Sequence, residues 1–95
     1  MIALVVKDNA IQNITNKIKK YIIMQLNCIS PDEHTRSLSY YGVTSIKYVM
    51  LISYIENEFG VFFSDEDFFE HSLDTISDLT KIVCEKLEIE IDESL

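Results

Sequence analysis

The sequence predicts an all-α protein: a small four-helix bundle with three longer helices, one short helix and a long first loop. Two observations support this. The chain of 95 residues is 47% hydrophobic and contains only two glycines and one proline, which favours a helix-rich globule with a modest core. Apolar residues also recur at helical spacing in three segments, separated by turn residues. We therefore expect one domain over residues 1–95.

The first helix is expected to begin at the capping box Asn9-Ala10-Ile11-Gln12. Residues 1–8 form a leader; its first six residues are expected to be extended, and it either packs loosely on the bundle or is disordered. The apolar stripe of this helix is expected to face the core and contains Ile11, Ile14, Ile18, Tyr21, Ile22 and Leu26.

A long connection follows over residues 28–43, with Leu38 and Tyr41 as its expected anchors in the core. The central helix then lies between Gly42 and Gly60. Thr44 is its predicted N-cap, which makes Ser45 the first helical residue. The expected core face of this helix contains Tyr48, Leu51, Ile52, Ile55 and Phe59.

The opposite face of the central helix is unusually apolar for a surface. It carries Ile46, Lys47, Met50, Ser53, Tyr54 and Asn57, with Val49 at its margin. One interpretation is a helix buried on both sides. The other is a docking surface beside a modified serine, because the unpaired N–H groups and the positive dipole end of a helix favour a phosphate on Ser45.

The remaining chain predicts two more helices. After Val61-Phe62-Phe63, which are expected to pack under the bundle, Ser64 or Asp65 caps a short helix that runs to about Glu70. Thr75 and Asp78 form a capping box for the last helix. Its core stripe is expected to contain Ile76, Leu79, Ile82, Val83 and Leu87, and residues 88–95 are expected to be a frayed acidic tail.

The amino-acid composition and charge argue against several functions. A net charge of −8 and a pI near 4.5 oppose binding to nucleic acid or an anionic membrane, and favour basic protein partners. The longest apolar run is too short to span a bilayer, and the N-terminus lacks the features of a secretory signal. We expect a soluble, cytoplasmic protein in which Cys28 and Cys84 are reduced.

No catalytic or metal-binding motif emerges. Ser45 does not lie in a Gly-x-Ser-x-Gly elbow, because Lys47 occupies the place of the second glycine. His34 and His71 are isolated, so both are expected to be solvated surface residues. Asp65, Asp67 and Glu70 lack the glycine and distant glutamate of a calcium loop.

The order of these motifs resembles the acyl and peptidyl carrier proteins. The resemblance rests on Gly-Val-Thr-Ser-Ile at residues 42–46, Glu-Asn-Glu-Phe-Gly-Val at 56–61, Ser-Asp-Glu-Asp-Phe at 64–68 and Thr-Ile-Ser-Asp-Leu at 75–79, and it extends over residues 38–83. It implies a protein that is not an enzyme but carries phosphopantetheine, attached to Ser45 by a partner transferase. The terminal thiol would then hold acyl or aminoacyl groups as thioesters.

The resemblance also implies partners, namely the transferase and the enzymes that load and process the cargo; we expect a monomer. The predicted contact surface, which we call the outer-face patch, contains Thr44, Ile46, Lys47, Val49, Met50, Ser53 and Tyr54.

Two features depart from the common family pattern. Thr44 stands where the family most often has aspartate, and Lys47 and Met50 occupy outward positions on a helix that is usually acidic in fatty-acid carriers. These differences suggest a specialised pathway of the polyketide, nonribosomal-peptide or related type. The alternative is an unmodified helical interaction module, which would account for Thr44 without further assumption.

Overall fold

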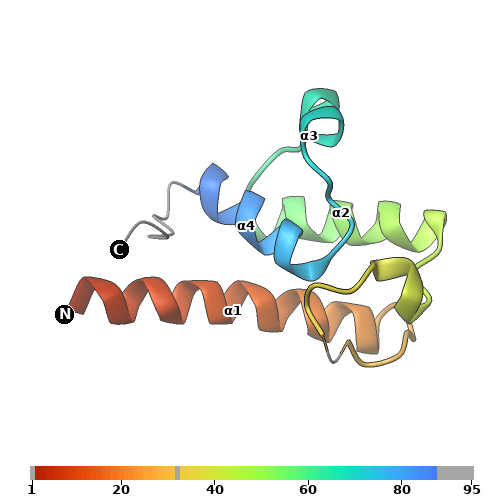
Figure 1. Ribbon diagram of the computed structural model, residues 1–95, viewed down its shortest axis with the longest axis horizontal. Coiled ribbons are helices and arrows are strands. Elements are labelled where there is room, and N and C mark those ends of the chain that lie inside the picture. Colours follow the sequence, from red (N-terminus) through yellow and green to blue (C-terminus); the bar gives the residue numbers. More distant parts are fainter. Residues whose placement is uncertain (1, 32, 88–95) are drawn as a thin grey trace.

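The computed structural model describes residues 2–31 and 33–87, and all its regular elements in this range are helical (Figure 1). They are α1 (Ile2–Met24), the 3₁₀ helix η1 (Leu38–Tyr41), α2 (Ser45–Phe59), α3 (Asp65–Glu70) and α4 (Ile76–Lys86). This confirms the predicted class, a four-helix bundle with one short helix and a long first loop.

The start of α1 differs from the prediction. The helix begins at Ile2, so the expectation of an extended segment over residues 1–6 is wrong for the residues described, and Asn9 lies inside the helix instead of capping it. Residues 2–8 contain no glycine or proline, so nothing in the sequence interrupts the helix before Asn9.

The core forms around one face of α1. Ile14, Ile18, Ile22 and Leu26 of this segment are buried, as predicted. They share one cluster with Leu51 and Ile55 of α2 and with the apolar residues of α4, which are Ile76, Leu79, Ile82 and Val83. The buried hydroxyls of Thr15 and Thr80 lie 3.2 Å apart, so this polar pair in the α1–α4 contact is hydrogen-bonded.

The α1 and α2 helices meet along an antiparallel seam. Lys17 Nζ donates to Glu58 Oε2 at 2.7 Å, and the rings of Tyr21 and Tyr54 stack with centroids 4.2 Å apart. This arrangement corrects the expected orientation of Tyr54. Helical projection places it on the outer face of α2, but its ring is half-buried against the core because Tyr21 lies opposite.

The long loop is fixed to the start of α4. Leu38 and Tyr41 are buried, as predicted. The backbone N–H of Leu38 donates to the carbonyl of Asp74 at 2.8 Å, and that of Ser77 donates to the carbonyl of His34 at 2.9 Å. These bonds place the residues before α2 beside the residues before α4. Cys28 and Cys84 are both free thiols.

The short helix α3 projects from the bundle (Figure 1). Ser64 caps it in a capping box with Asp67, and Lys86 of α4 holds Asp67 in a salt bridge of 2.8 Å. Two packing predictions near it are wrong. Phe62 is 73% exposed while its neighbour Phe63 is buried, and Leu87 is 38% exposed because it follows the end of α4. The predicted acidic tail, residues 88–95, lies outside the described residues.

Among the helices described, none combines the length and apolar character that crossing a membrane would require.

We expect Ile55→Ala to lower the free energy of unfolding by about 2–5 kcal/mol, because it removes a fully buried side chain and leaves a cavity. The matched control is Ile46→Ala on the same helix, where the side chain is 74% exposed and the change should stay within about 0.5 kcal/mol. Urea unfolding of both variants measures the difference. Equal losses would contradict the assigned core face of α2.

Candidate functional site

The start of α2 is built by three consecutive turn residues. Gly42 has a φ of 97°, a left-handed conformation that glycine adopts without strain. Val43 is buried and anchors the turn. Thr44 then caps the helix as predicted, its Oγ1 accepting a hydrogen bond of 3.4 Å from the backbone N–H of Lys47. Ser45 is therefore the first residue of the helix, and its side chain is exposed.

The electrostatics at this terminus suit a phosphate. The N–H groups of the first turn and the positive end of the helix dipole attract an anion. The first turn of α2 contains no acidic residue that would repel one. Thr44 thus caps the helix with a neutral side chain. An exposed hydroxyl in this setting fits the attachment of a phosphodiester.

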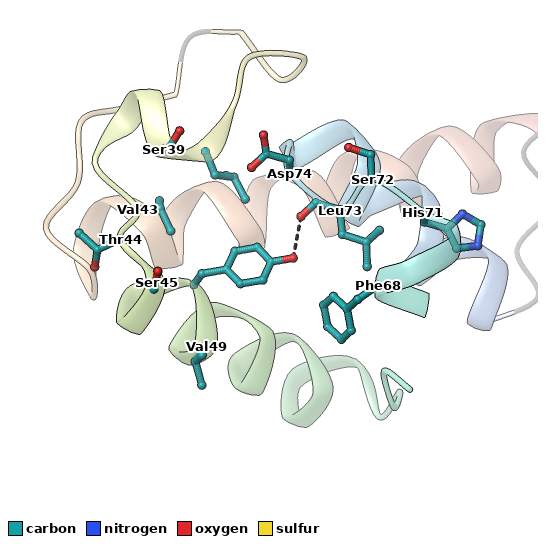
Figure 2. Close-up of a pocket in the computed structure, with 12 residues that line it drawn as sticks. Ser39, Val43, Thr44, Ser45, Val49, Phe68, His71, Ser72, Leu73 and Asp74 are labelled. Atoms are coloured by element: carbon teal, nitrogen blue, oxygen red, sulfur yellow. Dashed lines mark hydrogen bonds between the residues drawn. The ribbon is translucent and has the colours of Figure 1, made fainter. Parts of the chain in front are cut away.

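An open groove of about 530 Å³ begins at Ser45 (Figure 2). It lies between the start of α2, η1 and the connection from α3 to α4. The side chains around it are both apolar and polar; its lining residues are Leu38, Ser39, Val43, Thr44, Ser45, Tyr48, Val49, Phe68, His71, Ser72, Leu73 and Asp74. A group attached to Ser45 would have this groove beside it.

Tyr48 lines the groove and links α2 to the α3–α4 connection. Its hydroxyl donates a hydrogen bond of 2.6 Å to the carbonyl of Leu73. Burial, with a smaller contribution from the negative charges of Asp74 and Asp78, raises the pKa of Tyr48 to about 12. The phenol therefore stays protonated at neutral pH and remains a hydrogen-bond donor.

The outer-face patch is only partly a continuous exposed surface. Ile46 is 74%, Val49 67% and Met50 44% exposed, and Thr44 and Ser53 are also exposed. The remaining two members, Lys47 and Tyr54, are half-buried. The Lys47 amine lies 3.8 Å from Cys28 Sγ, so this side chain follows the protein surface instead of extending into solvent.

Sequence reasoning did not identify the far side of the groove. Phe68, His71, Ser72 and Leu73 line it, although they follow Ser45 by more than twenty residues. The side chain of His71 is exposed, in agreement with the prediction of a surface residue, but the structure places it at the groove. Helical periodicity describes single helices, so it contains no signal for this contact between α2 and the α3–α4 connection.

Comparison with known protein families gives one decisive match. The family model described as the phosphopantetheine attachment site matches residues 16–83, which is most of the chain. This protein belongs to the phosphopantetheine attachment family. No curated protein and no solved structure matched the chain.

Membership of this family establishes the general role of the protein. The protein is a carrier that holds phosphopantetheine covalently on a serine, and it is not itself an enzyme. The matched range covers α2, α3 and most of α4, so the carrier domain includes Ser45 and the whole groove beside it.

The burial of the Tyr48 phenol should make stability depend on pH in the alkaline range. Because the folded state raises the pKa of this phenol from 10.0 to about 12, its stabilising contribution is complete below about pH 10 and is lost as the pH rises towards 12. At neutral pH, Tyr48→Phe should cost about 1 kcal/mol of unfolding free energy. Urea unfolding of both proteins between about pH 9 and about pH 12 should show this difference shrinking with pH. A difference that stays constant over this range would contradict the assignment.

Proposed function

We propose that Ser45 is the serine that carries the phosphopantetheine arm. The observation that carries this proposal is the exposed Ser45 hydroxyl on the first residue of α2, at one end of the 530 Å³ groove. When bound, the group supplies a terminal thiol that holds acyl or aminoacyl cargo as a thioester. The residues of this chain present the linkage and do not react with the cargo.

Four other serines offer a poorer environment for the attachment. Ser64 uses its hydroxyl to cap α3, and the hydroxyls of Ser37 and Ser39 lie 2.8 Å apart in a mutual hydrogen bond. Ser53 is exposed, but it lies in the middle of α2, where backbone N–H groups are already paired within the helix. Ser45 combines exposure with a helix N-terminus whose first turn contains no acidic residue. Ser77 is also exposed at the start of a helix, but Asp78 lies in that first turn.

The groove suits a carrier whose cargo spends part of its time against the protein. Val43 and Val49 lie close to Ser45 and offer apolar contact, while Ser72 and Asp74 offer polar groups further along (Figure 2). Cargo with both apolar and polar parts therefore fits best, in agreement with a specialised acyl or aminoacyl pathway such as polyketide or nonribosomal-peptide synthesis. We place this activity in the cytoplasm.

The outer-face patch is the proposed contact for partner enzymes. Exposed Ile46, Val49 and Met50 lie within two turns of Ser45, so an enzyme that binds them has the modified serine within reach. A small apolar contact of this kind suits partners that must bind and release in turn.

Incubation with coenzyme A and a broad-specificity phosphopantetheinyl transferase should add one phosphopantetheine to the wild-type protein. Intact-mass spectrometry measures the addition. Ser45→Ala should remain unmodified, whereas the matched control Ser77→Ala, which also removes an exposed hydroxyl from the first turn of a helix but lies outside the outer-face patch, should be modified like wild type. Addition to Ser45→Ala would show that another residue carries the group. If several transferases leave wild type unmodified, the unmodified interaction module becomes the better explanation, with Thr44 as the first residue to test.

Charge reversal at Lys47 should slow this modification. Lys47→Glu places a carboxylate in the first turn of α2, where it opposes both the transferred phosphate and a partner adapted to the lysine. We expect kcat/KM of the transferase to fall about tenfold, by loss and reversal of one interfacial charge. Lys19→Glu is the matched control, since Lys19 lies on α1 near His34 and belongs neither to the outer-face patch nor to the lining of the Ser45 groove. Equal rates for the two variants would count against Lys47 as a contact residue.

A further inference from the structure

A second groove, separate from the one at Ser45, lies along the seam between α1 and α2. Its volume is about 320 Å³, and it shares no lining residue with the Ser45 groove. The residues that line it are Lys17, Lys20, Tyr21, Met24, Gln25 and Tyr54. We call it the seam groove.

The walls of the seam groove are apolar and its edge is basic. The stacked rings of Tyr21 and Tyr54 form a rigid aromatic wall with an interplanar angle of 12°. Met24 beside them is 63% exposed, although it is a large apolar side chain. Lys17 and Lys20 also line this groove. Glu58 is not a lining residue, but it pairs with Lys17 and offsets its charge. The seam groove therefore offers a ligand an aromatic slot beside the ammonium group of Lys20.

The charge around this groove is opposite to that of the whole protein. Residues 9–31 contain three lysines and no acidic residue, and α2 contains Lys47 but no acidic residue before Glu56. Most of the 16 acidic residues lie after residue 55. The net charge of −8 thus comes mainly from the second half of the chain, whereas residues 9–31, which provide most of the lining of the seam groove, contain lysines and no acidic residue.

We propose that the seam groove is a docking surface for an acidic segment of a partner protein, one that places an apolar side chain between flanking carboxylates. The apolar side chain would pack on Tyr21, Met24 and Tyr54, and the carboxylates would pair with Lys20. Charge selects this occupant. Basic partners would be repelled by the lysines of the groove. A short acidic segment brings far fewer negative charges against the net charge of −8 than a nucleic acid does, and two copies of the chain repel one another because each carries −8.

The proposal does not depend on modification of Ser45, because the two grooves are lined by different residues. It also revises the expectation of basic partners, which rests on net charge alone. A partner that binds the seam groove would leave the Ser45 groove uncovered, although Tyr54 belongs to both the seam groove and the outer-face patch.

The test is an NMR titration of the ¹⁵N-labelled full chain with the peptide acetyl-Glu-Glu-Leu-Phe-Glu-Glu-amide, compared with the same peptide carrying lysine in place of each glutamate. We expect saturable shifts of the Lys20, Tyr21, Met24 and Tyr54 amides with the acidic peptide, and binding at least about tenfold weaker for the basic one. No saturable shift at these amides, or equal shifts with both peptides, would overturn the proposal.

Two variants separate the groove from general charge effects. Lys20→Glu should weaken binding of the acidic peptide about fivefold or more, because it reverses the charge at the groove. Lys19→Glu makes the same charge change at the preceding residue, which lies near His34, and should have little effect. Equal weakening by both variants would show a response to net charge and overturn the proposal.

Two further observations complete the test. Ser45→Ala should bind the peptide like wild type, which distinguishes this surface from the proposed attachment site. Sedimentation of the free protein should show a monomer; self-association that salt or Lys20→Glu abolishes would assign the groove to a second copy and overturn the choice of occupant.

Discussion

The buried isoleucine stripe of α1 is the surface on which the rest of the structure depends. Ile18 and Ile22 are completely buried, and both α2 and α4 contribute residues to the same cluster. A stripe of this kind fixes the rotation of α1 and therefore decides which residues meet along the α1–α2 seam. The contacts Lys17–Glu58 and Tyr21–Tyr54 set the register of α2, and this register places its first residue, Ser45, at the end of the bundle beside the α3–α4 connection.

The parts of the fold that depend on local signals could be predicted from the sequence. Thr44, Ser64 and Thr75 each cap a helix through their own side chains, and Gly60 ends α2 in a left-handed conformation. These interactions involve residues at most four positions apart, so their pattern is visible in the sequence. For the same reason the sequence alone is enough to place Ser45 at a helix N-terminus.

The parts that depend on tertiary neighbours could not be predicted. Tyr54 projects from α2 towards what a helical projection treats as solvent, but Tyr21 of α1 covers it. Phe62 and Phe63 are adjacent and chemically identical, yet only Phe63 is buried. The hydrogen bond from Tyr48 to Leu73, which shapes the groove, joins residues 25 positions apart. Net charge is equally uninformative, because it averages the acidic second half of the chain with residues 9–31, which contain three lysines and no acidic residue.

These features describe a carrier with a helix terminus for the prosthetic group, a groove beside it, and an α1–α2 seam, for which we propose a partner, that shares Tyr54 with the outer-face patch. The claim that unites them is that the arm is attached at Ser45.

The most direct measurement is tandem mass spectrometry of proteolytic peptides from the protein isolated from the cells that produce it naturally. We expect phosphopantetheine on the peptide containing Ser45, with fragment ions that assign it to this residue. Phosphopantetheine on a different serine, or a Ser45 peptide found only unmodified in cells that make other holo-carriers, would contradict this claim.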